Sequence, residues 1–200
     1  GASSLELINS NPYILCDASI GLPFNSAEEL AGRIGEFSDS RIRIIAGVRY
    51  ILLENSYAGH SCLPLNKLLD TASKLLSLDR DKILEAIEDE PEVNGLYIAK
   101  SNSKSYIMLK ELYVAEDYIA RRLSIMNTLA YDTRINYDDV IDLAEREHGI
   151  NYAKEQRLAI NTALSKGFMI LTGGPGTGKT TALEAIISLL EQQGLRVMIC

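Results

Sequence analysis

The chain has 200 residues, of which 20 are basic and 27 acidic, and its net charge at neutral pH is −7. Hydrophobic residues make up 46% of the sequence, which predicts a folded chain of one or two domains and excludes a disordered one. No apolar run is long enough to cross a bilayer, and the small residues at positions 1–4 predict no secretory leader. The negative charge excludes a broad basic surface, so any contact with nucleic acid must be a local patch.

The cysteines and histidines predict no disulfide framework and no metal site. Cys16, Cys62 and Cys200 show no Cys-x-x-Cys spacing, and their odd number leaves one unpaired within the chain. This usage is typical of a reduced, cytoplasmic chain with free thiols. Neither His60 nor His148 has a cysteine, histidine or carboxylate at metal-ligand spacing, so we expect neither to bind a metal.

The first half of the sequence predicts several helices and one hairpin. A tight apolar turn, Gly21-Leu22-Pro23-Phe24, precedes a capping box that begins at Ser26, and Asp79 caps a later helix. Tyr97 and Tyr106 are predicted to face one another across the hairpin, where they pack in the core; stacking on the bases of a single strand is the alternative. Helices followed by a hairpin are the order of a winged-helix module. By apolar spacing, the predicted helices span residues 26–35, 40–58, 65–76 and the stretch after Asp79, and the hairpin strands span 96–99 and 106–109.

The second half predicts further helices at residues 111–129, 138–147 and 153–165. The last of these leads through Gly167 into the apolar run at residues 168–172, which has strand character. The side chains expected to point inward from the long helix are Leu112, Ala115, Ile119, Leu123 and Met126.

A phosphate-binding loop follows this apolar run. Its sequence matches the pattern G-x-x-x-x-G-K-[ST], and helical spacing at residues 181–193 follows it. This strand, loop and helix order is the context that the pattern requires, and it argues against a glycine-rich turn that binds nothing. The predicted phosphate-binding residues are Gly173, Gly174, Pro175, Gly176, Thr177, Gly178, Lys179, Thr180 and Thr181.

The expected cofactors are ATP and Mg²⁺. We expect Lys179 to reach the β- and γ-phosphates and Thr180 to place its hydroxyl on Mg²⁺. Gln156 lies 17 positions before Gly173, at the start of the helix that leads into the predicted strand. A side-chain amide has both donors and acceptors for the adenine edge. Although the alternative is an ordinary solvated side chain, we expect Gln156 to recognise adenine, because superfamily 1 helicases carry a glutamine at this place.

The sequence resembles the RecD/TraA-type ATP-dependent DNA helicases of superfamily 1, in particular the bacterial RecD-like members with a long N-terminal extension. The resembling segments spread over nearly the whole chain, which makes the match more specific than the phosphate loop alone. They are Asn11-Pro12-Tyr13, Gly21-Leu22-Pro23-Phe24, Ala27-Glu28, Gly59-His60, Leu63-Pro64, Ala115-Glu116, Ile119-Ala120, Glu155-Gln156 and Leu171 to Thr181.

This resemblance implies a helix-hairpin-helix region and a motor that moves 5′ to 3′ on single-stranded DNA. One position departs from the family, which usually has G-I-G-F where this chain has Pro23 in the turn. Because proline has no N–H to offer a DNA phosphate, we expect a structural role for this hairpin. A cluster of basic side chains facing phosphates is the alternative, and it would comprise Arg33, Arg41, Arg43 and Arg49.

The resemblance and the motifs together predict the N-terminal fragment of a helicase. The sequence after Thr181 shows neither the acidic pair nor the arginines that ATP hydrolysis needs, so we expect this chain alone to be inactive. The expected fold is mainly α with a small hairpin, followed by the opening β-loop-α-β of a RecA-like P-loop α/β domain. The second strand of that domain is expected at Leu195 to Cys200. The expected domains are a helix-hairpin-helix and winged-helix-like region at 1–110, a helical connector at 111–150 and the start of the motor at 151–200.

DNA is the expected partner of the whole protein, with weak binding by this chain and no membrane contact. Two other classes fit part of the sequence. One is a nucleotide or small-metabolite kinase, although such enzymes tend to place the loop near their N-terminus and lack the upstream glutamine. The other is a non-enzymatic module that contacts DNA or another protein.

Overall fold

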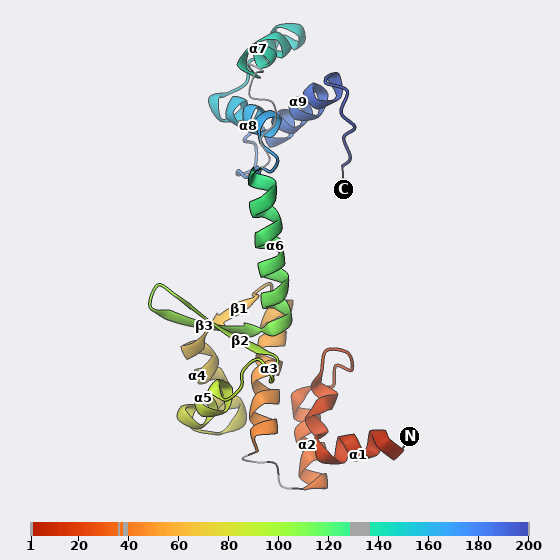
Figure 1. The fold of residues 1–200 in the computed structure, drawn as a ribbon, viewed down its shortest axis with the longest axis vertical. Helices are drawn as coiled ribbons and strands as arrows, with labels where there is room; N and C mark the ends of the chain where they lie inside the picture. Colours follow the sequence, from red (N-terminus) through yellow and green to blue (C-terminus); the bar gives the residue numbers. More distant parts are fainter. Residues whose placement is uncertain (1, 36, 38–39, 129–136, 200) are drawn as a thin grey trace. The chain divides into compact units, whose positions relative to one another are not determined.

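The computed structural model describes residues 2–35, 37, 40–128 and 137–199, and the chain divides into two compact units, Gly1–Asp117 and Tyr118–Cys200 (Figure 1). The chain is mainly helical, with one small antiparallel sheet among the described residues. The helices are α1 (Ala2–Ser10), the 3-10 helix η1 (Pro12–Cys16), α2 (Phe24–Ile34), α3 (Arg41–Tyr57), α4 (Leu65–Leu76), α5 (Arg80–Glu88), α6 (Lys110–Thr128), α7 (Tyr137–His148), α8 (Lys154–Ser165) and α9 (Lys179–Gln192), and the strands are β1 (Cys62–Pro64), β2 (Leu96–Ser101) and β3 (Lys104–Leu109).

Helix α3 runs through the core of the first unit. It packs against η1, α4, α5 and the sheet, and its Val48 is fully buried. The ring of Phe24 stacks on Tyr13 at one side and on Tyr50 at the other, with centroid distances of 5.7 and 5.8 Å. Burial of such large apolar side chains is the main force that stabilises the unit.

The predicted hairpin is confirmed, and it belongs to a three-stranded sheet with the order β1-β3-β2. Asn102 and Ser103 form its turn with positive φ values of 47° and 63°, as a two-residue hairpin connection requires. The short strand β1 was not predicted, because three residues between two helices carry no period of their own. The predicted pairing of Tyr97 with Tyr106 is wrong.

The register of β2 against β3 explains why these tyrosines are not opposite one another. Tyr97 lies opposite Met108, and Tyr106 lies opposite Ala99. The ring of Tyr97 instead stacks on Tyr113 of α6 at a centroid distance of 3.5 Å.

The predicted helices of the first unit are confirmed, with one change at α2 and two additions. The capping box at Ser26 is wrong, because α2 begins at Phe24 and Pro23 occupies its N-cap. The N–H groups of Ser26 and Ala27 donate to the carbonyl of Pro23, whose ring fixes a backbone angle that suits the start of a helix. Helices α1 and η1 were not predicted.

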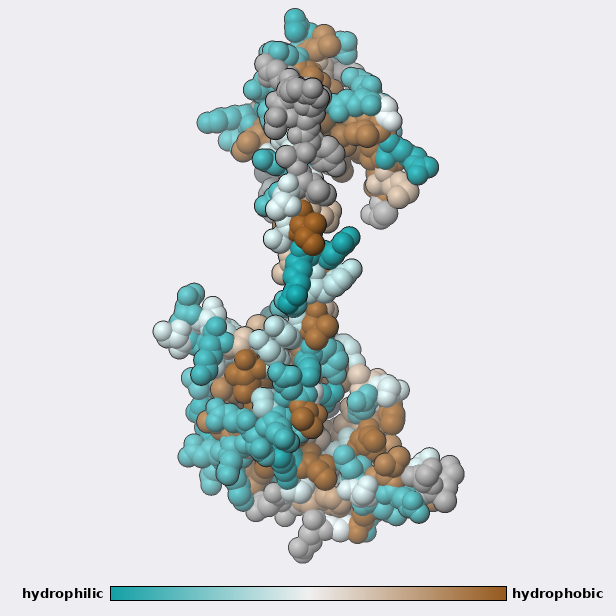
Figure 2. Space-filling view, in the orientation of Figure 1, coloured by the Kyte–Doolittle hydropathy of each residue, from teal (hydrophilic) through white to brown (hydrophobic). Residues whose placement is uncertain are grey.

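Helix α6 has the predicted length but not the predicted buried face. None of its described residues is buried, and Ile119 is 54% exposed. Leu112 alone among the predicted inward residues packs against the core of the first unit. Figure 2 shows hydrophobic residues at the surface along this helix, among them Val114 and Ile125 by their exposed fractions of 56% and 55%. Helical spacing thus gave the element, but burial requires a partner element to pack against it.

The second unit has its own core, formed by α7, α8 and α9. The predicted strand at residues 168–172 and the predicted strand that begins at Leu195 are not strands among the described residues, and Cys200 lies outside them. A strand exists only through hydrogen bonds to a neighbour, and no such neighbour is present for residues 168–172 or 195–199 in the described part. The loop and helix of the predicted β-loop-α-β are present; its strands are not.

No helix in the described ranges is long and apolar enough to span a membrane.

A partly buried ion pair joins four elements of the first unit. The guanidinium of Arg43 on α3 donates to both carboxylate oxygens of Glu28 on α2 at 2.7–3.0 Å and to the carbonyl of Leu76, which ends α4. The hydroxyl of Tyr13 on η1 donates to the same carboxylate at 2.5 Å. Burial alone would raise the pKa of Glu28, but the hydrogen bonds from Arg43 and Tyr13 and the charge of Arg43 outweigh it, so the pKa lies below its ordinary value.

This network predicts a loss of stability in acid. Because the pKa of Glu28 is lowered in the folded chain, the unfolded chain binds the proton more readily. The network therefore stabilises the fold above the ordinary value of 4.5, and this contribution is lost as the pH falls through the folded-state pKa. Urea midpoints measured over a series of pH values should fall below pH 4.5, and the Glu28→Gln variant should show a shallower fall. Identical pH dependence of the two proteins would contradict the assignment.

A substitution at Gly95, just before β2, tests how tightly the Arg49 side chain packs in the same unit. It has φ +68°, and a Cβ there would lie 1.9 Å from Nη1 of Arg49. Gly59 has a similar φ of +87° with nothing within 4 Å, so Gly59→Ala is a matched control for backbone strain alone. Gly95→Ala should lower the free energy of unfolding by about 1–3 kcal/mol more than Gly59→Ala, measured by urea denaturation. Equal losses would mean that Arg49 moves aside without cost.

Candidate nucleotide-binding site

The phosphate loop leads directly into α9. Gly178 is the N-cap of this helix with φ +74°, and Gly176 has φ +73°, so both adopt a left-handed conformation that favours glycine. The first hydrogen bond of α9 runs from the Ala182 N–H to the Gly178 carbonyl. The N–H groups of Lys179, Thr180 and Thr181 come before it and have no acceptor within the helix. Such a helix start attracts anions through these donors and through the helix dipole.

The lysine of the loop lies across the loop itself. Its Nζ donates to the carbonyls of Gly173 and Gly174, both at 2.6 Å. The hydroxyl of Thr177 donates to the Gly174 carbonyl at 2.9 Å and closes the same turn. The positive charge of Lys179 is therefore already positioned where the loop would surround a phosphate.

Thr180 and Thr181 occupy the exposed first turn of α9. Because they follow Lys179 directly, their hydroxyls lie at the same end of the helix as the loop. No group of histidine, cysteine and carboxylate side chains suited to hold a metal ion occurs among the described residues. The Thr180 hydroxyl is the candidate magnesium ligand from the loop, and in this loop class phosphate oxygens and a carboxylate from a later strand complete the set.

Gln156 is brought to the loop by the fold. Its Nε2 donates to the carbonyl of Gly178 at 3.1 Å, and its Oε1 accepts from the N–H of Ala153 at 2.8 Å. The sequence placed Gln156 and the loop in one site by their spacing, and the structure brings them into contact. The contact with Gly178 was not predicted. The only sign of it in the sequence is that residue 178 is glycine, which leaves room for the Gln156 amide.

Apolar packing between α8 and α9 supports this contact. Ile160 and Leu164 on α8 lie in one buried cluster with Ala185, Ile186 and Leu189 on α9. On its other side α8 is joined to α7 by Arg157, which lies 2.6 Å from Asp142 and 2.8 Å from Glu145. These hydrogen bonds, with that to Asp142 the stronger cause, raise the pKa of Arg157. Helix α8, which carries Gln156, is thus held by α9 through apolar contacts and by α7 through ion pairs.

The N-terminal hairpin turn uses its backbone donors internally. The N–H groups of Ile20 and Gly21 donate to the Asp17 carbonyl, that of Leu22 to the Leu15 carbonyl, and that of Ser19 to the Asp17 carboxylate. Pro23 has no N–H. The backbone donors of this turn are thus engaged within the fold, and its structural role in the whole protein stays a prediction.

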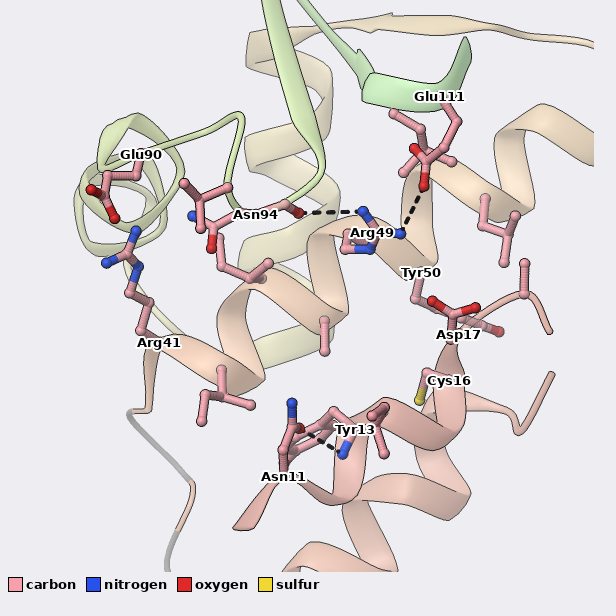
Figure 3. A pocket seen from close by; sticks show the side chains of 18 residues that line it. Asn11, Tyr13, Cys16, Asp17, Arg41, Arg49, Tyr50, Glu90, Asn94 and Glu111 are labelled. Carbon is pink, nitrogen blue, oxygen red and sulfur yellow. Dashed lines mark hydrogen bonds and ion pairs between the residues drawn. The ribbon is translucent and has the colours of Figure 1, made fainter. Parts of the chain in front are cut away.

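The arginines considered as a phosphate-facing cluster are largely paired. Arg43 binds Glu28, as described above, and Arg41 makes an ion pair with Asp89. Arg49 lies 3.2 Å from Glu111 and donates to the carbonyls of Asn94 and Gly95. Arg41 and Arg49 line a cavity of about 480 Å³ in the first unit (Figure 3). These three side chains are thus engaged within the fold while Arg33 is exposed, and a phosphate-facing role for the four arginines stays an alternative prediction.

Two sequence families match different parts of the chain. Residues 1–62 match the family described as the ATP-dependent RecD2 DNA helicase HHH domain, and residues 156–200 match an AAA domain. The second match begins at Gln156 and contains the whole phosphate loop. The two matches therefore cover the N-terminal hairpin and the candidate nucleotide site separately.

Three curated relatives are RecD-type proteins by name. The chain is 26% identical over its whole length to the ATP-dependent RecD2 DNA helicase of Deinococcus radiodurans, of which it covers 29%. It is 33% identical over 44% of its length to the RecBCD enzyme subunit RecD of Haemophilus influenzae, covering 13% of that protein. It is 55% identical over 20% of its length to the RecBCD enzyme subunit RecD of Mycolicibacterium smegmatis, covering 7% of that protein.

The chain thus spans less than a third of the length of these relatives. Their names and the two family matches agree with each other and do not favour the kinase or the non-enzymatic alternative. Together with a phosphate loop at the start of α9, they make the chain similar to the RecD-type ATP-dependent DNA helicases.

Proposed function

We propose that this chain supplies the ATP-binding start of the motor of a DNA helicase, in a protein that unwinds duplex DNA with the energy of ATP hydrolysis. The observation that carries the proposal is the arrangement of Lys179 and Gln156 around one helix start, at Gly178. The AAA-domain match over the same residues supports a RecA-like continuation, in which residues 168–172 and 195–200 become strands once neighbours pair with them.

The residues take distinct roles in this proposal. Lys179 exchanges the carbonyls of Gly173 and Gly174 for the β- and γ-phosphates, because a phosphate is the stronger partner for an ammonium. Backbone N–H groups of the loop and of the first turn of α9 bind the phosphate oxygens. Thr180 binds Mg²⁺, and Gln156 pairs with the adenine edge. The remaining loop residues, Pro175, Thr177 and Thr181, shape the turn that surrounds the phosphates.

The first unit has a structural part in this proposal. The relatives' names place helix-hairpin-helix domains in DNA helicases, but the hairpin donors and three of the four arginines here are engaged within the fold. We therefore propose that the main DNA contacts of the whole protein lie in its motor. The translocation direction, 5′ to 3′, is proposed from the family resemblance.

The central test is Lys179→Ala. The substitution should weaken binding of Mg-ATP by at least about tenfold, because it removes a charge that hydrogen bonds to phosphate. Alanine is tolerated at a helix start, so the circular dichroism spectrum should not change. Titration calorimetry of the two proteins measures the effect, with the exposed Lys166→Ala as the matched control. Equal affinity for wild type and Lys179→Ala would overturn the nucleotide site.

The second test concerns DNA. Residues 1–112 contain 11 basic and 16 acidic residues, a net charge of −5, and phosphate contacts supply most non-specific affinity for DNA. The chain should bind labelled single- or double-stranded DNA only weakly at physiological salt, in a fluorescence anisotropy titration. Tight binding with a steep salt dependence would contradict the structural role of the hairpin. Loss of such binding in an Arg33→Ala variant would then locate the contact.

A further inference from the structure

The carbonyl of Gly178 receives two hydrogen bonds. One comes from the N–H of Ala182 at 3.0 Å and begins α9; the other comes from Nε2 of Gln156 at 3.1 Å. Gly178 is at once the last residue of the phosphate loop and the N-cap of α9. A side chain from α8 therefore holds the junction at which the loop becomes a helix.

Gln156 is itself fixed from the opposite side. Its Oε1 accepts from the N–H of Ala153 at 2.8 Å, which ties the amide to the start of α8. A primary amide has two N–H donors and two acceptor lone pairs. After both contacts, one N–H and one lone pair remain, which is what the adenine edge needs. Holding the loop and recognising a base therefore do not compete.

The Gln156 amide lies very close to Gly178. A Cβ at Gly178 would lie 2.1 Å from Nε2 of Gln156, although the amide and the glycine belong to different helices. Gly176, two residues earlier, has nearly the same φ but nothing within 4 Å of a Cβ. A methyl group at Gly178 would therefore displace the amide of Gln156 from its present place, in addition to the strain that its positive φ imposes.

We propose that Gln156 is a positioning residue of the phosphate loop, acting on every ligand that carries phosphates whatever its base. By fixing the Gly178 carbonyl it fixes the orientation of the first turn of α9, whose free N–H groups receive the phosphate oxygens. The proposal rests on the proposed function of the loop. It goes beyond adenine recognition, because it extends to a ligand that has no base.

Inorganic tripolyphosphate with Mg²⁺ is the probe that separates the two roles. Calorimetric titration of the full chain should show about fivefold weaker binding for Gln156→Ala, the usual effect of one lost hydrogen bond. Gln192→Ala, a glutamine at the exposed end of α9, is the matched control and should bind within about twofold of wild type. If Gln156→Ala weakens ATP binding but leaves tripolyphosphate binding unchanged, Gln156 reads the base alone and the proposal is wrong.

Hydrogen exchange of the chain without added ligand tests independently whether Gln156 holds the phosphate loop. The amide of Ala182, which bonds to Gly178, should exchange faster in Gln156→Ala than in wild type and should not change in Gln192→Ala. Failure of the wild-type chain to bind tripolyphosphate would contradict the proposed function. The exchange rates would still decide whether Gln156 holds the loop. Unchanged exchange at Ala182 would overturn that role.

A pair of glycine substitutions tests the same contact through stability. Gly178→Ala should lower the melting temperature more in the wild-type background than in Gln156→Ala, because the second background has no side-chain amide to collide with the new methyl group. Gly176→Ala should cost the same in both backgrounds, since it has the same φ and open space. Strict additivity of Gly178→Ala and Gln156→Ala would show that the two residues are not coupled.

Discussion

The packing of α8 against α9 is the interaction on which the candidate site depends. Phosphate-binding groups lie at the start of α9, and the amide that could meet a base lies at the start of α8. The two helices share a buried apolar cluster that includes Ile160 and Ile186, so their first turns are held at a fixed separation. Directional contacts, such as the one from Gln156 to Gly178, then act within a geometry that the apolar contact has already set.

The first unit is held together by a partly buried ion pair. Arg43 brings three elements together around Glu28 and Tyr13, and it also satisfies the carbonyl that ends α4. An ion pair that is partly withdrawn from water stabilises a fold best when its remaining donors find acceptors, and Nη1 of Arg43 finds one at Leu76. The same use of arginine recurs at Arg49, which holds the loop before β2. By satisfying internal acceptors in this way, these arginines help to hold the first unit together.

Lys179 is held in place within the candidate phosphate loop. The ammonium of Lys179 is held by two carbonyls of the loop, so its charge is partly compensated before any ligand arrives. Phosphate binding would replace these neutral acceptors with charged ones, without moving the lysine far. Gly178 stays fixed from α8 in the meantime. Pre-positioned donors lower the entropic cost of binding, which is the physical advantage of building the loop on two packed helices.

The sequence by itself determined most helices, the hairpin and the residues of the phosphate loop, because helical period, turn residues and the loop pattern are local properties. Leu65–Leu76 and the hairpin from Leu96 to Leu109 illustrate this. Only the tertiary structure decided which side chains are buried and which polar groups meet. It left α6 without a buried residue, paired Arg43 with Glu28 across 15 positions and Gln156 with Gly178 across 22. It also left residues 168–172 without strand pairing, because a strand, unlike a helix, takes its hydrogen bonds from another segment.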